Sequence, residues 1–214
     1  MKYCLICPSL VATGADGPAA SLARLAGALA RRGHEVHLLR GADPGPPPPG
    51  VVVHAIRRRW WSALGAIRRR LGALRPEVVH LHDPDLAARR GLLEITSPGA
   101  IKLLTTQTIP SAGRPADRLA RASRTLDGLI CAGMAGIAGV EPRGPRVAIT
   151  QIPHLPADGD AWSEADHVGR YLTLIDSCRR TRRIRFDHAR PHAGPEARGK
   201  ARREVGVAGT SPPG

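Results

Sequence analysis

The chain has 214 residues, which is enough for one α/β domain with a sizeable core but hardly for two. Its net charge of +14 comes almost entirely from arginine, since lysine occurs only at positions 2, 102 and 200. Three Trp, two Tyr and one Phe offer little surface for stacking bases, and no zinc-finger, homeodomain or aromatic RNA-binding pattern is present. A basic nucleic-acid-associated protein is therefore only a weaker alternative, since the positive charge is the one feature that favours it.

Neither a membrane span nor a disulfide scaffold is expected. No apolar stretch approaches the roughly 20 residues that cross a bilayer, and the apolar start of the chain ends at Pro8, too early for a secretory signal. Four cysteines are few for a disulfide framework in a chain of this length. Cys4 and Cys7 lie three apart on a predicted strand and face opposite sides, which disfavours a metal or redox pair. We therefore expect a cytoplasmic protein, with membrane contact at most peripheral.

The first 40 residues predict a strand, a glycine-bearing turn, a helix and a second strand. Residues 2–7 are a short apolar run, and residues 13–18 form the turn. Apolar spacing predicts the helix over residues 19–32, with Gly33 after its end, and a second strand over residues 36–39. A helix that begins just after a strand directs free backbone N–H groups and a positive dipole end toward the sheet edge. A phosphate or sugar can approach such a turn.

Strands and helices continue to alternate as far as about residue 155. Further strands are predicted over residues 51–56, 77–82, 101–106, 128–131 and 147–149, and helices over residues 57–74 and 115–126. This alternation predicts a single Rossmann-like α/β domain over residues 1–155, with a parallel sheet of six or seven strands covered by helices on both faces. Residues 156–214 are basic and rich in glycine and proline, so we expect an irregular tail or the remnant of an interdomain linker, with residues 177–214 mostly outside the core.

Two segments carry a family resemblance in this order. Residues 22–39 include Gly33-His34-Glu35-Val36, and residues 75–83 read Arg-Pro-Glu-Val-Val-His-Leu-His-Asp. They are similar to the L-A-x-x-L-x-x-R-G-H-E-V and R-P-D-V-V-H-x-H-D signatures of family-4-type glycosyltransferases of the GT-B fold, in their N-terminal domain. Residues 103–107 and 148–154 resemble two weaker segments of that domain.

The resemblance implies transfer of a sugar from a nucleotide-sugar donor to an acceptor, without a metal or other cofactor. The N-terminal domain would hold the acceptor, possibly lipid-linked, and a second domain would hold most of the donor, with the leaving diphosphate stabilised in the cleft between them. No second domain follows residue 155 in this sequence, so we expect a truncated, single-domain or split relative that is incomplete without a donor-binding domain or chain. A non-catalytic module that binds an acceptor or a protein partner is the alternative.

Six residues are predicted to bind substrate where the strands end, although no residue is assigned a catalytic role. Ligands bind outside the carboxyl ends of parallel strands in open α/β sheets. Three of the six belong to the first turn, which has Gly14-Ala15 where the family commonly has two glycines, and Gln107 stands where the family has a cleft histidine. The predicted residues are Gly14, Asp16, Gly17, His82, Asp83 and Gln107.

Each of these residues also has a plainer interpretation. The glycines can serve only the turn, Asp16 is favoured as the cap of the first helix, and His82 with Asp83 can simply end a strand. His80 and His82 face the same side of their strand, but no set of further ligands completes a metal site around them. The sequence therefore predicts no metal.

The helix over residues 57–74 carries the candidates for membrane docking. Arginines flank two adjacent tryptophans, a composition that suits an anionic headgroup layer such as the inner face of a membrane. The favoured alternative is an ordinary helix that packs Trp60, Leu64, Ile67, Leu71 and Leu74 on the sheet. The docking candidates are Arg57, Arg58, Trp61 and Arg68.

Overall fold

The computed structural model describes residues 1–7, 18–41, 46–56, 60–82, 99–106, 125–132, 147–152 and 163–189. The chain separates into two compact units, Met1–Arg179 and Arg180–Gly214. The first unit holds the sheet and its helices. In the second unit, the described residues are 180–189, the last part of a helix that begins in the first.

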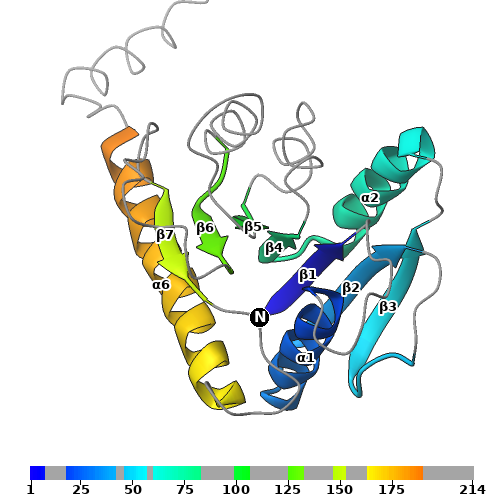
Figure 1. Cartoon of the computed structure of the whole chain (residues 1–214). Helices are drawn as coiled ribbons and strands as arrows, with labels where there is room; N and C mark the ends of the chain where they lie inside the picture. The colour runs from blue at the N-terminus through cyan, green and yellow to red at the C-terminus, as the bar shows by residue number, and fades with distance from the viewer. Residues whose placement is uncertain are drawn as a thin grey trace, which may run out of the picture. The chain divides into compact units, whose positions relative to one another are not determined.

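A single seven-stranded parallel sheet forms the centre of the first unit (Figure 1). The strand order β3-β2-β1-β4-β5-β6-β7 reverses direction between β1 and β4, which creates the topological switch point of a doubly wound sheet. This arrangement confirms the predicted Rossmann-like class. The strands are β1 (Lys2–Cys7), β2 (Glu35–Gly41), β3 (Val51–Ile56), β4 (Val78–Leu81), β5 (Ile101–Thr106), β6 (Gly128–Cys131) and β7 (Ala148–Gln151).

The central strands have buried side chains on both faces of the sheet, since successive side chains point to opposite sides and helices cover both. In β1, Leu5 and Cys7 belong to one hydrophobic cluster, whereas Cys4 and Ile6 belong to the other. The prediction that Cys4 and Cys7 face opposite sides is therefore confirmed. All four cysteines are buried, and none of them forms a disulfide.

Helix α1 (Pro18–Arg31) packs on the first face. It buries Leu22, Leu25 and Leu29, the apolar positions that predicted it. Gly33 follows the helix with φ of 79°, and the N–H groups of Gly33 and His34 donate to carbonyls in the last turn of α1. Such a left-handed residue satisfies the free carbonyls of a helix end and turns the chain directly into β2.

Helix α2 (Trp60–Leu74) packs on the opposite face. Ile67 and Leu71 are fully buried, and Leu64 and Leu74 are partly buried against the same cluster. This is the stripe expected of an ordinary sheet-packed helix, for the side chains that the structure describes. The side chains of Trp60 and Trp61 are not among them.

Helix α6 (Glu164–Ala189) corrects the prediction of an irregular tail for residues 164–189 (Figure 1). It lies on the α1 face and contributes five residues to the same core: Val168, Tyr171, Leu174, Ile175 and Cys178. Its first turn is capped by Ser163, whose hydroxyl accepts from the N–H of Asp166 at 3.1 Å. Cys178 belongs to this core, and the first unit extends to Arg179.

No helix within the described ranges is both long and apolar enough to cross a membrane. The helix predicted over residues 115–126 lies outside these ranges except for its last two residues, which form a turn and an irregular position.

Candidate functional site

Most of the predicted site residues lie outside the part of the chain that the structure describes. Gly14, Asp16, Gly17, Asp83 and Gln107 belong to the segments around the strand ends that are not described, as do Arg57 and Arg58. The structure places His82 directly after β4 and places Arg68 on the exposed side of α2. Whether the six predicted substrate-binding residues converge stays a prediction.

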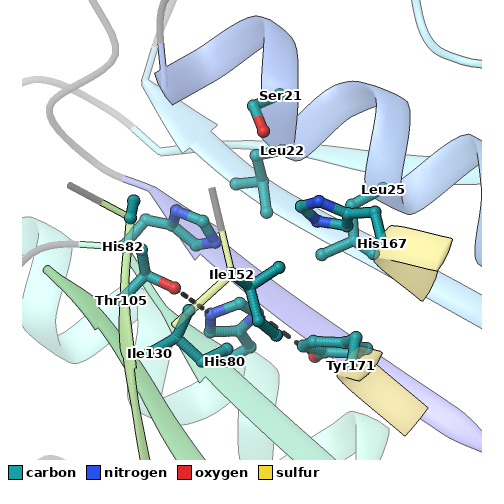
Figure 2. A pocket seen from close by; sticks show the side chains of 11 residues that line it. Ser21, Leu22, Leu25, His80, His82, Thr105, Ile130, Ile152, His167 and Tyr171 are labelled. Carbon is teal, nitrogen blue, oxygen red and sulfur yellow. Dashed lines mark hydrogen bonds between the residues drawn. The ribbon is translucent and has the colours of Figure 1, made fainter. Parts of the chain in front are cut away.

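His82 lines a pocket at the carboxyl edge of the sheet (Figure 2). The walls come from the first half of α1, the first half of α6 and the ends of β4, β5, β6 and β7. About 290 Å³ of space lies between them, including the part that opens to solvent. The lining residues are Ser21, Leu22, Leu25, His80, His82, Thr105, Ile130, Ala132, Ile152, His167 and Tyr171.

The sheet extends by one residue past several strands and thereby positions the pocket floor. The N–H of His82 donates to the carbonyl of Ile6 at 2.9 Å. The N–H groups of Ala132 and Ile152 donate in the same way to carbonyls at the ends of the neighbouring strands, at 2.9 and 3.1 Å. Three lining residues therefore belong to the rigid ladder rather than to a loop.

A buried histidine lies at the base of the pocket. His80 is only 1% exposed and is in register with Leu5 of β1 and Leu103 of β5. Both of its ring nitrogens have partners: Nε2 lies 2.6 Å from Oγ1 of Thr105, and Nδ1 lies 3.1 Å from the hydroxyl of Tyr171 (Figure 2). A short polar chain thus runs from α6 across β4 to the end of β5.

His82, the residue directly after β4, lies against His80. The rings of His80 and His82 have centroids 4.3 Å apart, tilted by 45°, which confirms that the two side chains share one side of the strand. His82 is partly exposed, whereas His80 is buried beneath it. The His80 ring therefore supports the His82 ring from below.

Burial controls the protonation of His80 and Tyr171. It lowers the pKa of His80 well below the usual value of 6.5, and the nearby His82 and His167 lower that pKa further. Burial also raises the pKa of Tyr171 well above the usual value of 10.0. Near neutral pH the group at the base of the pocket is therefore a neutral imidazole beside a protonated phenol.

Five polar residues that line the pocket are not predicted as site residues from the sequence. The sequence pattern relates His80 only to His82, places Thr105 only in a strand and places Ser21 only in a helix. His167 and Tyr171 fall in the segment predicted to be irregular. Their spacing of four residues, which places them on one face of a helix, is the signal that could have indicated them.

The residues that the structure describes do not complete a metal site around these histidines. Within residues 1–7, 18–41, 46–56, 60–82, 99–106, 125–132, 147–152 and 163–189, no group of three or more His, Cys, Asp or Glu side chains is arranged to hold a metal ion. The polar groups of the pocket can donate and accept hydrogen bonds, and its apolar wall can contact carbon atoms.

Comparison with known proteins places this architecture in a family. No curated protein matches the chain. The sequence profile described as Glycosyltransferase Family 4 matches residues 15–131, which is more than half of the chain. The matched segment runs from before α1 to the end of β6 and includes His80, His82 and Thr105, whereas β7 and α6 lie beyond it. The chain therefore belongs to Glycosyltransferase Family 4, and its Rossmann-like sheet is a glycosyltransferase domain.

Proposed function

We propose that this domain is the acceptor side of a glycosyltransferase and that the pocket beside His82 holds the acceptor. The observation that carries this proposal is the position of the pocket. It lies at the carboxyl edge of a parallel sheet, next to the switch point between β1 and β4, where open α/β sheets bind their ligands.

The composition of the pocket supports a sugar-like ligand. Ser21, Thr105 and His82 offer hydroxyl and imidazole groups, whereas Leu22, Ile130 and Ile152 offer an apolar wall. A few convergent polar groups on an apolar surface are typical of small-molecule sites, and they complement a sugar, which has both hydroxyl groups and C–H faces. None of the lining residues in the described part carries a carboxylate.

The donor would be a nucleotide-sugar, with no resident cofactor. Its nucleotide would be bound by a second domain or chain, and its diphosphate would approach the turn over residues 14–17, where the N-terminus of α1 offers backbone donors. We therefore expect little or no sugar transfer by this chain alone. Measurable turnover of a nucleotide-sugar by the purified chain would contradict the proposal that a second domain or chain binds the donor. No turnover with any added donor-binding domain would instead favour a non-catalytic module that binds the acceptor or a partner.

Titration by NMR with methyl α-D-glucopyranoside and related glycosides tests the pocket directly. Amide shifts should concentrate at the ends of β4, β5 and β6, and His82→Ala should weaken binding about fivefold or more, because one hydrogen-bonding group is lost. His54→Ala is a matched control, since His54 is another partly buried strand histidine that lies outside the pocket. A His82→Ala protein that unfolds while His54→Ala remains stable would favour a purely structural role for His82.

Docking on an anionic membrane surface from the cytoplasmic side belongs to the same proposal. Arg68, Arg69 and Arg70 are all exposed on α2. Each basic residue near an anionic leaflet contributes about 1 kcal/mol, so the three could hold the domain reversibly near a lipid-linked acceptor. Replacing all three by glutamine should abolish co-sedimentation with anionic vesicles at low salt. Binding that is equal on neutral and anionic vesicles would remove the membrane from the proposal.

A further inference from the structure

The polar chain Tyr171–His80–Thr105 joins a helix outside the family match to the wall of the pocket. We propose that Tyr171 is a positioning residue that fixes the direction of this chain. The Tyr171 hydroxyl donates to Nδ1 of His80, Nε2–H of His80 donates to Oγ1 of Thr105, and the Thr105 hydroxyl is left to donate its own proton to an oxygen atom of the bound ligand.

Counting protons leaves only two arrangements for the chain. A neutral imidazole has one N–H donor and one acceptor nitrogen, so one of its two contacts donates and the other accepts. In the first arrangement the protons point from Tyr171 toward Thr105. In the reverse arrangement the Thr105 hydroxyl donates to Nε2, and Nδ1–H donates to the oxygen of Tyr171.

The surroundings of Tyr171 select the first arrangement. Its side chain is only 1% exposed, and His80 is the hydrogen-bond partner of its hydroxyl within the described residues. The reverse arrangement would leave the phenolic proton buried without an acceptor, which is costly. The raised pKa of Tyr171 and the lowered pKa of His80 agree with a protonated phenol and a neutral ring.

Thr105 and Tyr171 both line the pocket, but Thr105 is 8% exposed and Tyr171 only 1%. The Thr105 oxygen already accepts from His80 in this arrangement, so its proton is available to a ligand or to water. At Thr105 the pocket therefore favours a ligand atom that accepts a hydrogen bond, such as a sugar oxygen. It disfavours an ammonium group, which can only donate. The identity of the ligand as a sugar rests on the proposed function, whereas the direction of the chain does not.

The tautomer of His80 can be read directly in the full chain. Long-range ¹H–¹⁵N NMR on histidine-labelled protein at pH 7.5 should show His80, identified by its contacts with the Tyr171 ring, as the Nε2–H tautomer. In Tyr171→Phe the Nδ1 signal should move toward that of an imidazole nitrogen without a hydrogen bond. Tyr3→Phe is the matched control: Tyr3 is equally buried and its ring lies beside Tyr171, but its hydroxyl lies 3.7 Å from Sδ of Met1 and does not contact His80.

An Nδ1–H tautomer or a charged ring in the wild-type protein would overturn the proposal, whatever the behaviour of the variants. An equal change of the His80 signal in Tyr3→Phe and Tyr171→Phe would also overturn it, since the effect would then be one of packing. Neither readout depends on a sugar being bound.

The ligand arm of the proposal uses methyl α-D-glucopyranoside as the probe. Thr105→Val keeps the shape of the side chain but removes the hydroxyl, and it should weaken binding about fivefold, whereas Thr105→Ser should restore it. Equal binding by the valine and serine variants would refute donation by Thr105. If the wild-type protein binds no glycoside while His80 shows the Nε2–H tautomer, the proposed function fails and the direction of the chain stands.

Discussion

Helices α1 and α6 pack on the same face of the sheet and supply two walls of the same pocket, yet only α1 could be recognised in the sequence. The buried stripe of α1 is apolar throughout, with Leu22, Leu25 and Leu29 at helical spacing. The buried stripe of α6 begins with His167 and includes Tyr171, and arginines surround it. In α6, residues that line the site replace the apolar residues by which a helix is normally recognised.

The largest expected effect is the loss of stability when a cavity is made under either helix. Similar losses would show that α1 and α6 contribute equally to the core. Leu29 on α1 and Ile175 on α6 are both fully buried. Replacing either by Ala should lower the free energy of unfolding by about 2–5 kcal/mol, measured by urea denaturation. A cost below about 1 kcal/mol for Ile175→Ala alone would mean that α6 is only loosely attached.

A smaller effect is expected where α6 approaches β6 closely. A Cβ added to Gly128 would lie 2.7 Å from Cδ2 of Leu103 and 3.2 Å from Sγ of Cys178. Both neighbours are buried, so Gly128→Ala should destabilise the protein by about 1–3 kcal/mol through overpacking. Gly72→Ala on α2 is the control: nothing lies within 4 Å of its added Cβ, and alanine favours a helix. Equal melting temperatures for the two variants would contradict close packing of α6.

The pH dependence of stability should depend on His80, the β4 partner of Tyr171 on α6, and not on the apolar stripe of α1. The folded-state pKa of His80 lies below its unfolded value of 6.5, so the unfolded chain binds the proton more readily. The stability that His80 contributes is complete above pH 6.5 and is lost as the pH falls below that value. The loss should grow steadily as the pH is lowered from 6.5 to 5.5. His34 and His54, whose pKa values burial also lowers, act in the same direction.

Unfolding free energies measured in urea from pH 7.5 to 5.5 check this sign. Leu29→Ala should lower the whole curve without changing its slope, because the substitution leaves every histidine in place. A wild-type stability that is constant or increases toward pH 5.5 would show that His80 is not held neutral in the folded state.

The smallest effect is expected for the ion pair that joins the end of α1 to the start of α6. Arg31 and Glu164 form this pair with side chains that are 55% and 47% exposed. Glu164→Gln should cost no more than about 1 kcal/mol, and the difference from wild type should shrink in 1 M NaCl. A larger, salt-independent loss would mean that the contact between the helices is maintained by charge rather than by packing.

Local patterns predicted most of the described fold. Each of the seven strands was located to within about two residues, because short apolar runs such as Val51–Ile56 are bounded by proline, glycine or charged residues. Helices α1 and α2 were found from their stripes. The edge of the sheet that holds His82 also followed from topology alone, because strands in such units are parallel.

The base of the pocket could not be predicted in the same way. Tyr171 and His80 are 91 residues apart in the sequence, and no local pattern links them. The partner of His80 on the other side, Thr105, lies 25 residues away on another strand. Such contacts depend on how α6 lies across the sheet, which hydrophobic spacing does not encode. The convergence of Gly14, Asp16, Gly17, Asp83 and Gln107 around His82 stays a prediction.

The burial of Tyr3 beneath Tyr171 also has a consequence for synthesis of the protein. Their rings lie 6.3 Å apart, although one belongs to the first strand and the other to the last described helix. During translation the part of the α1 face that α6 covers therefore stays exposed until α6 has left the ribosome, and parallel sheets with such distant contacts fold slowly. Nascent chains that end before residue 164 should expose this apolar face and need a chaperone, whereas chains long enough to release α6 should not.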